Sequence, residues 1–273
     1  MTNQVYGWDY PLKEVTIPYI NKCKLFVEND DAFANFRQDE DYIRILEGKD
    51  INVGAFYLTK IVENNYLTEF LDNINKFKEN DIYGNPILSD YNGLDILIER
   101  INHNTVMYAY HTLDMKSLIG TFQPKRIIEI GGGYGGMCKA FSCIYNFDEY
   151  VLVDLPDVIA LCKKYLSNFH SLYKKVAFLT PEDIKINNSF GNFDLSIAVF
   201  SMSECNKETQ NMYADKIIMN SEYSFIGYNK MHVSGVSDIY SELIAKFSKN
   251  YDISYDDLIR KIDCKYIYLR RKN

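Results

Sequence analysis

IIEIGGGYGG, residues 127–136, is a short apolar run followed at once by a glycine-rich segment. The pattern predicts a strand that ends at Ile130 and a helix that begins near Gly136. Glycines at such a crossover allow the backbone to turn sharply and to approach a ligand where a Cβ atom would collide. The first turn of the helix then offers free N–H groups to a carboxylate or a phosphate. The stretch therefore predicts the ligand-binding loop of an α/β sheet.

The sequence around this loop predicts an α/β fold for residues 119–273. Strand-like apolar runs alternate with helical patterns, which argues for βαβ units and a parallel sheet with both faces covered. An antiparallel hairpin is the expected end of such a sheet. We predict strands at 126–130, 150–154, 175–179, 193–200, 223–228 and 266–269, and helices at 136–145, 156–166, 209–219 and 237–249.

The first 118 residues form a mainly helical region by the same criteria. The segment from Asn80 to Pro86 is rich in turn-forming residues and interrupts the helical pattern. We therefore place a domain boundary near residue 118 and expect residues 1–118 to form a helical, acceptor-binding cap over the sheet, with the acceptor pocket between them. Apolar periodicity predicts helices at 32–46, 53–62, 66–77, 94–101 and 105–119.

The composition limits the classes of function. The chain has 273 residues and a formal net charge of -7 without a clustered basic run, which argues against a nucleic-acid partner. The six cysteines form no CxxC pair, and no HxxH-type or paired acidic ligand cluster occurs, so we expect free thiols and no metal ion. The N-terminus does not resemble a signal peptide, and no apolar stretch has the length of a membrane-spanning helix. These features predict a soluble, cytoplasmic protein with a small-molecule partner, and they leave a homodimer open.

Two classes of ligand fit the glycine loop. Gly131, Gly133 and Gly136 match the GxGxxG fingerprint of dinucleotide-binding proteins. Glu129 followed by Gly131, Gly133 and Gly135 matches the methyltransferase form, an acid and then x-G-x-G-x-G. A carboxylate gains a partner beside the ammonium of S-adenosylmethionine, whereas beside a pyrophosphate it would meet repulsion. Glu129 therefore favours S-adenosylmethionine, and a nicotinamide dinucleotide is the alternative.

Two further acids follow predicted strands. Asp154 ends the strand after the loop, where an acid can accept both ribose hydroxyls of an adenosine; the alternative is a cap for the helix led by Pro156. Asp183 belongs to the sequence TPED, residues 180–183. This sequence is typical of a capping box and Asp183 could equally contact the adenine amino group, so we keep both interpretations.

Four segments in combination resemble a known family: IIEIGGGYGG (127–136), VLVDLPDV (151–158), FDLSIAVFSMSE (193–204) and FIGYNKM (225–231). They are similar to the class I S-adenosylmethionine-dependent methyltransferases, and more narrowly to bacterial sugar O-methyltransferases found among surface-polysaccharide genes. The Tyr83–Pro86 turn resembles that family too, so the resemblance covers most of the chain. It implies a Rossmann-like, seven-stranded class I methyltransferase sheet with an N-terminal α-helical cap. It also implies methyl transfer to a sugar hydroxyl.

The resemblance implies a cofactor site and an acceptor site at one edge of the sheet. Ser203 and Glu204 would face the acceptor. The sequence departs from the family at Met202, where an aromatic residue is usual, and this departure concerns the acceptor pocket more than the cofactor site. We assign the cofactor site to Glu129, Gly131, Gly133, Tyr134, Gly135, Asp154, Leu155, Asp183 and Ser201.

An alcohol acceptor must lose its proton when it attacks the methyl group, so one base is expected near the acceptor. Glu204 and His232 are the candidates, because they follow two strands whose ends we expect to be adjacent. The alternative for each is an ordinary polar loop residue. His103 and His111 lie on late N-terminal helices, where they either roof the site or are simply packed or solvated.

Three other functions remain open on these patterns. An NAD-dependent sugar oxidoreductase or epimerase could be built on the same loop. A methyltransferase for a non-sugar oxygen, such as a phosphate-derived group of a capsule precursor, would need no strong base. A non-catalytic binding protein could keep the fold without turnover.

Overall fold

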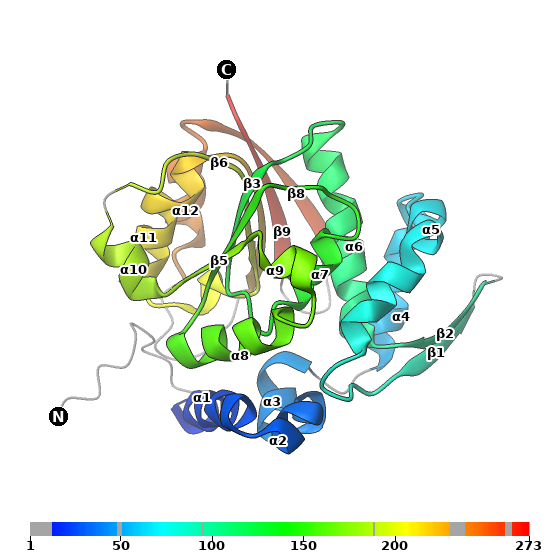
Figure 1. Ribbon diagram of the computed structural model, residues 1–273. Helices are drawn as coiled ribbons and strands as arrows, with labels where there is room; N and C mark the ends of the chain where they lie inside the picture. The colour runs from blue at the N-terminus through cyan, green and yellow to red at the C-terminus, as the bar shows by residue number, and fades with distance from the viewer. Residues whose placement is uncertain are drawn as a thin grey trace.

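A seven-stranded sheet forms the centre of the computed structural model, which describes residues 13–47, 51–93, 96–187, 189–229, 238–259 and 264–272 (Figure 1). Among these residues the strands lie in the order β5-β4-β3-β6-β7-β9-β8. β3 to β7 pair in parallel, and β9 is antiparallel to both of its neighbours. The predicted Rossmann-like, seven-stranded α/β fold is therefore confirmed. The strands are β3 (Arg126–Ile130), β4 (Glu149–Val153), β5 (Val176–Leu179), β6 (Phe193–Val199), β7 (Ser221–Asn229), β8 (Tyr251–Ile259) and β9 (Cys264–Arg271).

The strand order reverses between β3 and β6, and this reversal positions the ligand site. β3 pairs with β4 on one side and with β6 on the other. The connections from β3 and from β6 therefore leave toward opposite faces of the sheet and open a crevice at its carboxyl edge. β8 and β9 form the expected closing hairpin, and β8 occupies a segment for which no separate strand was predicted.

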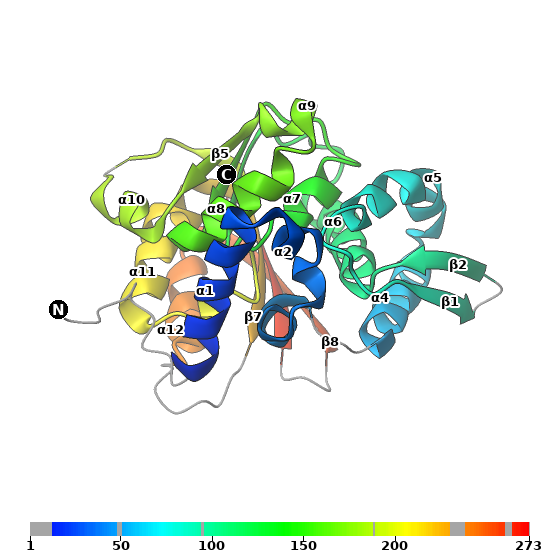
Figure 2. The same cartoon turned by 60° about the horizontal axis from the view of Figure 1, so that its bottom comes forward.

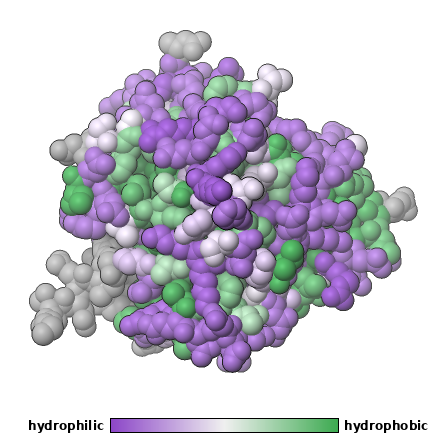
Figure 3. Space-filling view, viewed as in Figure 1, coloured by the Kyte–Doolittle hydropathy of each residue, from purple (hydrophilic) through white to green (hydrophobic). Residues whose placement is uncertain are grey.

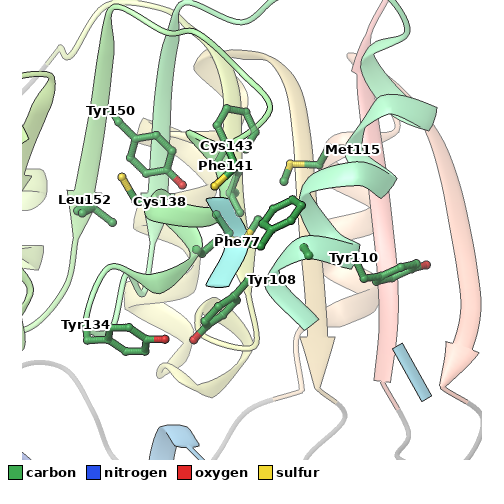
Figure 4. Close-up of a cluster of buried hydrophobic side chains, with 14 of the residues drawn as sticks. Phe77, Tyr108, Tyr110, Met115, Tyr134, Cys138, Phe141, Cys143, Tyr150 and Leu152 are labelled. Atoms are coloured by element: carbon green, nitrogen blue, oxygen red, sulfur yellow. The ribbon is translucent and has the colours of Figure 1, made fainter. Parts of the chain in front are cut away.

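Helices cover both faces of the sheet because its strands alternate apolar side chains between two cores. Ile127 and Leu152 belong to the core under α6 and α7, whereas Ile128 and Val151 belong to the core under α11 and α12. Figure 4 shows part of the first core, in which aromatic rings from α6 and the loop after β3 pack together. The helices are α6 (His103–Ile119), α7 (Gly136–Phe141), α8 (Pro156–Leu166), α9 (His170–Tyr173), α10 (Pro181–Ile186), α11 (Lys207–Lys216) and α12 (Tyr240–Phe247).

The N-terminal region is helical apart from one hairpin, and α1 and the short helices after it lie beside α8 (Figures 1 and 2). Lys164 of α8 fixes this contact, since its ammonium donates to the carbonyl oxygens of Phe26 and Val27. The elements are α1 (Lys13–Glu28), α2 (Asp30–Ala34), the 3-10 turn Phe36–Gln38, α3 (Glu40–Tyr42), the π-helical turn Ile43–Glu47, α4 (Ile51–Glu63), α5 (Leu67–Lys78), the 3-10 turn Glu79–Asp81, β1 (Ser89–Gly93) and β2 (Ile96–Ile101).

Two helix predictions in this region were wrong. The segment 32–46 is not one helix, because Asn35 leaves the helical conformation and Asp39 is an extended N-cap that accepts hydrogen bonds from Asp41 N and Tyr42 N. The second error concerns 94–101, whose described part is strand β2, paired with β1. Its isoleucines at 98 and 101 are buried three residues apart, which imitates a helical period over so short a stretch.

Helix α6 joins the N-terminal region to the sheet. It begins at His103 and is buried on nearly all sides, since it packs between the N-terminal helices and the sheet. The division at residue 118 lies at its end and stays a prediction. The face in Figure 3 is mainly hydrophilic with scattered apolar residues. Within the described ranges, no helix is long and apolar enough to cross a membrane.

Candidate functional site

The glycine loop after β3 has a backbone that other residues adopt poorly. Gly131, Gly133 and Gly135 have φ angles of 81°, 52° and 94°. A Cβ atom on Gly131 would lie 2.2 Å from Cβ of Ser201, which follows β6. The loop thus needs glycine both for its left-handed turns and for the close approach of a neighbouring chain segment.

Asp154 holds this loop from the end of the neighbouring strand. Its Oδ2 accepts a hydrogen bond from Gly133 N at 2.8 Å, and its Oδ1 accepts one from Leu155 N at 2.7 Å. Burial raises the pKa of the carboxyl to about 6. Helix α8 begins after Leu155 without a side-chain cap, so the arrangement differs from the helix-cap alternative. A carboxylate oxygen accepts more than one hydrogen bond, so Asp154 retains the capacity to bind hydroxyls.

Glu129 lies beneath the loop and not on the surface of the crevice. Its side chain is buried, and it accepts a hydrogen bond from the hydroxyl of Tyr150 at 2.8 Å. Burial raises the pKa of Glu129 to about 8, and the nearby charge of Asp154 adds to the shift. The side chain is therefore mostly protonated near pH 7, unless a cation stabilises its charged form.

Tyr134 of the loop points into the core. Its ring is buried and packs edge-on against Tyr165 of α8, with centroids 4.8 Å apart. Figure 4 shows its hydroxyl directed toward that of Tyr108 on α6. The side chain therefore connects the loop to two helices.

The capping interpretation of Asp183 is confirmed. Asp183 Oδ2 accepts hydrogen bonds from Thr180 N at 2.7 Å and from Thr180 Oγ1 at 2.6 Å, and Thr180 Oγ1 accepts one from Asp183 N. The hydrogen bonds from the Thr180 side chain and backbone lower the pKa of Asp183. A contact between Asp183 and an adenine stays a prediction.

The segment after β6 returns to the glycine loop. Phe200 has a φ of 52°, and Ser201 Oγ then donates to the carbonyl oxygen of Ile130 at 2.5 Å. Glu204 lies in a 3-10 turn, Met202–Glu204, at the same edge of the sheet. Met202 is buried in the core on the α11 side, so the residue that departs from the family pattern fills a core position.

Several assigned residues meet around one small cavity. Gly131, Asp154, Leu155 and Ser201 line it together with Ile130, Val153, Pro181, Cys205 and Tyr213. Its volume is about 20 Å³, which is the space of about one water molecule. A nucleoside that filled this space would therefore have to displace the side chains that line it. His232 lies outside the described residues.

Residues from the N-terminal region approach the loop, and the sequence patterns did not identify them as site residues. Leu46 faces Gly133, since a Cβ atom on Gly133 would lie 3.2 Å from Leu46 Cδ1. The guanidinium carbon of Arg37 lies 4.9 Å from the centre of the Tyr134 ring. These residues are about 90 positions from the loop, so no local spacing relates them to it.

The remaining candidates have structural partners. His103 Nε2 lies 2.5 Å from the carbonyl oxygen of Glu47, and His111 Nε2 lies 2.7 Å from the hydroxyl of Tyr266. Burial lowers the pKa of His111 to about 3. In the part of the chain that the structure describes, the cysteines are buried and free, and no three His, Cys, Asp or Glu side chains converge as a metal site requires.

Comparisons with known proteins concern the fold. No protein-family model and no curated protein matches the chain. The pyocyanin biosynthetic protein PhzM is similar in structure, with 13% identity, a TM-score of 0.42, and coverage of 60% of this chain and 58% of that one. The mitomycin 7-O-methyltransferase MmcR has 13% identity and a TM-score of 0.44, with coverage of 62% of this chain and 56% of that one. The CurJ carbon methyltransferase has 13% identity and a TM-score of 0.43, with coverage of 62% and 55%. The chain spans little more than half the length of these proteins, and similarity at this level assigns no activity to it.

Proposed function

We propose that the chain is an S-adenosylmethionine-dependent O-methyltransferase that acts on a small acceptor, with a sugar hydroxyl as the first candidate. The observation that carries the proposal is the bond between Asp154 and Gly133. It joins an acid at the end of β4 to a glycine loop at the end of β3, where the strand order reverses. This arrangement offers acceptors for ribose hydroxyls beside a loop whose N–H groups approach the ligand.

The residues around the loop fit a nucleoside with a cationic tail. Gly131 and Gly133 would hold the methionine portion, and Asp154 would accept the ribose hydroxyls. Bound there, S-adenosylmethionine supplies an electrophilic methyl group whose sulfur leaves as a neutral thioether.

The charges near the loop favour a cation over a pyrophosphate. Glu129 and Asp154 are both buried, and the charge of Asp154 disfavours ionisation of Glu129. A pyrophosphate would add negative charge to this pair, whereas an ammonium or sulfonium would stabilise both carboxylates. This electrostatic balance supports a methyl donor over the NAD alternative.

Of the two candidate bases, Glu204 is the one that lies within the described residues. Its position after β6 is at the same edge as the loop, so its carboxylate would take the proton of an acceptor hydroxyl as the oxygen–methyl bond forms and the sulfur–methyl bond breaks. His232 is the second candidate. An acceptor oxygen that is already ionised, such as that of a phosphate-derived group, needs neither base.

Ligand-dependent thermal stability tests the proposal. S-adenosylhomocysteine at saturating concentration should raise the melting temperature, whereas NAD should leave it unchanged, because only a ligand of the native state stabilises it. A rise with NAD alone would exclude the proposed cofactor. Mass spectrometry of products formed from a panel of nucleotide-linked sugars then tests the acceptor, and binding without any methylated product would favour the non-catalytic alternative.

A further inference from the structure

A buried polar cluster lies in the N-terminal region beside the glycine loop. It consists of Arg37, Tyr42, Glu47 and Asp81. Arg37 and Tyr42 have no exposed surface, Glu47 is 2% exposed, and the side chain of Asp81 is 5% exposed. Charged side chains are rarely buried so completely unless partners satisfy them.

The arginine of the cluster is shared between two carboxylates. Arg37 Nε donates to Glu47 Oε1 at 2.8 Å, and Arg37 Nη1 donates to Asp81 Oδ1 at 3.2 Å. Asp81 is satisfied from the protein, because it also accepts hydrogen bonds from Asn102 N and Thr105 Oγ1. One guanidinium and two carboxylates leave an excess of one negative charge.

Three polar atoms of the cluster have no hydrogen-bond partner among the described residues. They are Arg37 Nη2, Glu47 Oε2 and the hydroxyl of Tyr42. Arg37 Nη2 does lie 2.7 Å from Glu47 Oε1, but this is an ion-pair distance without the alignment of a hydrogen bond. A donor and an acceptor buried without protein partners in one cluster indicate a place for a small polar group, either an ordered water molecule or part of a ligand.

The cluster adjoins the loop that the proposed cofactor would contact. Arg37 lies over the ring of Tyr134, and Leu46, next to Glu47, packs against Gly133. The backbone of Glu47 is held in place, since Asn104 Nδ2 donates to its carbonyl oxygen at 2.9 Å. A ligand that runs along Gly133 and displaces the Leu46 side chain would reach Glu47 and Arg37.

We propose that this cluster binds the amino-acid end of the methyl donor, an inference that rests on the proposed function. Glu47 Oε2 accepts a hydrogen bond from the donor's ammonium, and Arg37 Nη2 donates to its carboxylate. A zwitterion satisfies both unpartnered groups at once, which neither a cation nor an anion alone can do. The excess negative charge also suits S-adenosylmethionine, whose sulfonium, ammonium and carboxylate sum to one positive charge.

Two ligands that differ only in the amino-acid end test the inference. S-adenosylhomocysteine carries the zwitterion, and 5′-methylthioadenosine lacks it. Calorimetry should show that Glu47→Gln lowers the affinity for S-adenosylhomocysteine by about tenfold. The double variant Arg37→Met/Glu47→Met should lower it by about 100-fold, because each charge-assisted hydrogen bond contributes roughly tenfold. Methylthioadenosine should bind all three proteins equally. The double variant removes both charges of the Arg37–Glu47 pair, so neither of these two is left without the other. Asp81 loses its ion pair with Arg37 but keeps the hydrogen bonds from Asn102 N and Thr105 Oγ1.

Glu149→Gln is the matched control. Glu149 pairs with Arg126 at 2.6 Å at the amino edge of the sheet, where both side chains are partly exposed. This substitution therefore removes an arginine–glutamate pair far from the loop and should change neither affinity. Equal losses for both ligands in the cluster variants, or no loss for either, would overturn the inference and leave the cluster a structural one. If the double variant does not fold, the ratio of the two affinities in Glu47→Gln decides. Failure of the wild-type protein to bind either ligand would instead refute the proposed function.

Discussion

The backbone N–H of Gly133 donates to Oδ2 of Asp154 at 2.8 Å, so the conformation of the glycine loop depends on an acid from the neighbouring strand. Asp154→Ala removes this acceptor and leaves a buried N–H unsatisfied, which should destabilise the protein by about 1–3 kcal/mol. We also expect S-adenosylhomocysteine to bind at least about tenfold more weakly, because the ribose acceptor is lost. Urea unfolding and calorimetry measure the two effects separately. Unchanged ligand affinity in the folded variant would exclude a ribose contact.

Alanine at Gly131 should be more disruptive than alanine at Gly120. Gly131 and Gly120 both have positive φ angles, so alanine at either position carries strain of about 1–3 kcal/mol. At Gly131 the new Cβ would also collide with Ser201, whereas nothing lies within 4 Å at Gly120. Gly131→Ala should therefore lower the melting temperature further and abolish binding of S-adenosylhomocysteine, and Gly120→Ala should retain it. Equal binding by both variants would show that the loop does not contact the ligand.

The buried carboxyl of Glu129 should make stability fall as the pH rises. Its pKa is about 8 in the folded protein against 4.5 normally, so the folded state holds the proton more tightly than the unfolded state. The stabilisation from this group is fully present below pH 4.5 and is lost progressively as the pH rises to about 8. The loss is roughly 1.4 kcal/mol for each unit of pH over which the folded state keeps the proton and the unfolded state does not. Glu129→Gln should flatten this dependence in urea unfolding between pH 5 and pH 8. Burial of neutral His111 has the opposite effect below about pH 6.5, so the difference between the two profiles isolates the contribution of Glu129. Parallel profiles for the wild-type protein and Glu129→Gln would contradict the buried, protonated state.

A comparison of the single variants Thr180→Ala and Asp183→Ala separates the two roles considered for Asp183, helix capping and contact with the adenine. Each removes one side of the capping box and should cost about 0.5–2 kcal/mol of stability. If Asp183 also contacts the adenine, only Asp183→Ala should lower the affinity for S-adenosylhomocysteine, by about tenfold, as measured by calorimetry. Equal affinities in the two variants would limit Asp183 to capping α10.

Replacement of the proposed base should reduce turnover without loss of the cofactor. Glu204→Gln is expected to lower kcat by about 10²–10⁴-fold while the affinity for S-adenosylhomocysteine stays the same. Glu208→Gln is the control, because Glu208 lies on α11 with a side chain that is 83% exposed. Full activity in Glu204→Gln, and also in His232→Ala, would favour an acceptor oxygen that needs no base.

The sheet could be predicted because its signals are local. A short run such as 127–130 that is followed at once by glycines is typical of a buried strand that ends at a ligand-binding loop. Short segments were harder, since residues 96–101 fit a helical and an extended period equally well. Pairing with β1, a contact that the segment itself does not encode, decides for the strand.

The site was only partly predictable for the same reason. Gly131, Asp154 and Ser201 follow three strands, and parallel strands bring their carboxyl ends to one edge. Arg37, Glu47 and Asp81 come together through the packing of short helical turns, with no repeating interval between them. Such clusters are visible only once the chain is folded.

The small cavity beside Asp154 has a kinetic consequence. Because its volume is about 20 Å³, a nucleoside that filled this space would enter only conformations in which the lining side chains have moved aside. At high concentration, the speed of association is then set by how frequently these open conformations form, and no longer by how frequently the ligand collides with the protein. Substitutions far from the reacting atoms can alter turnover through this opening step alone.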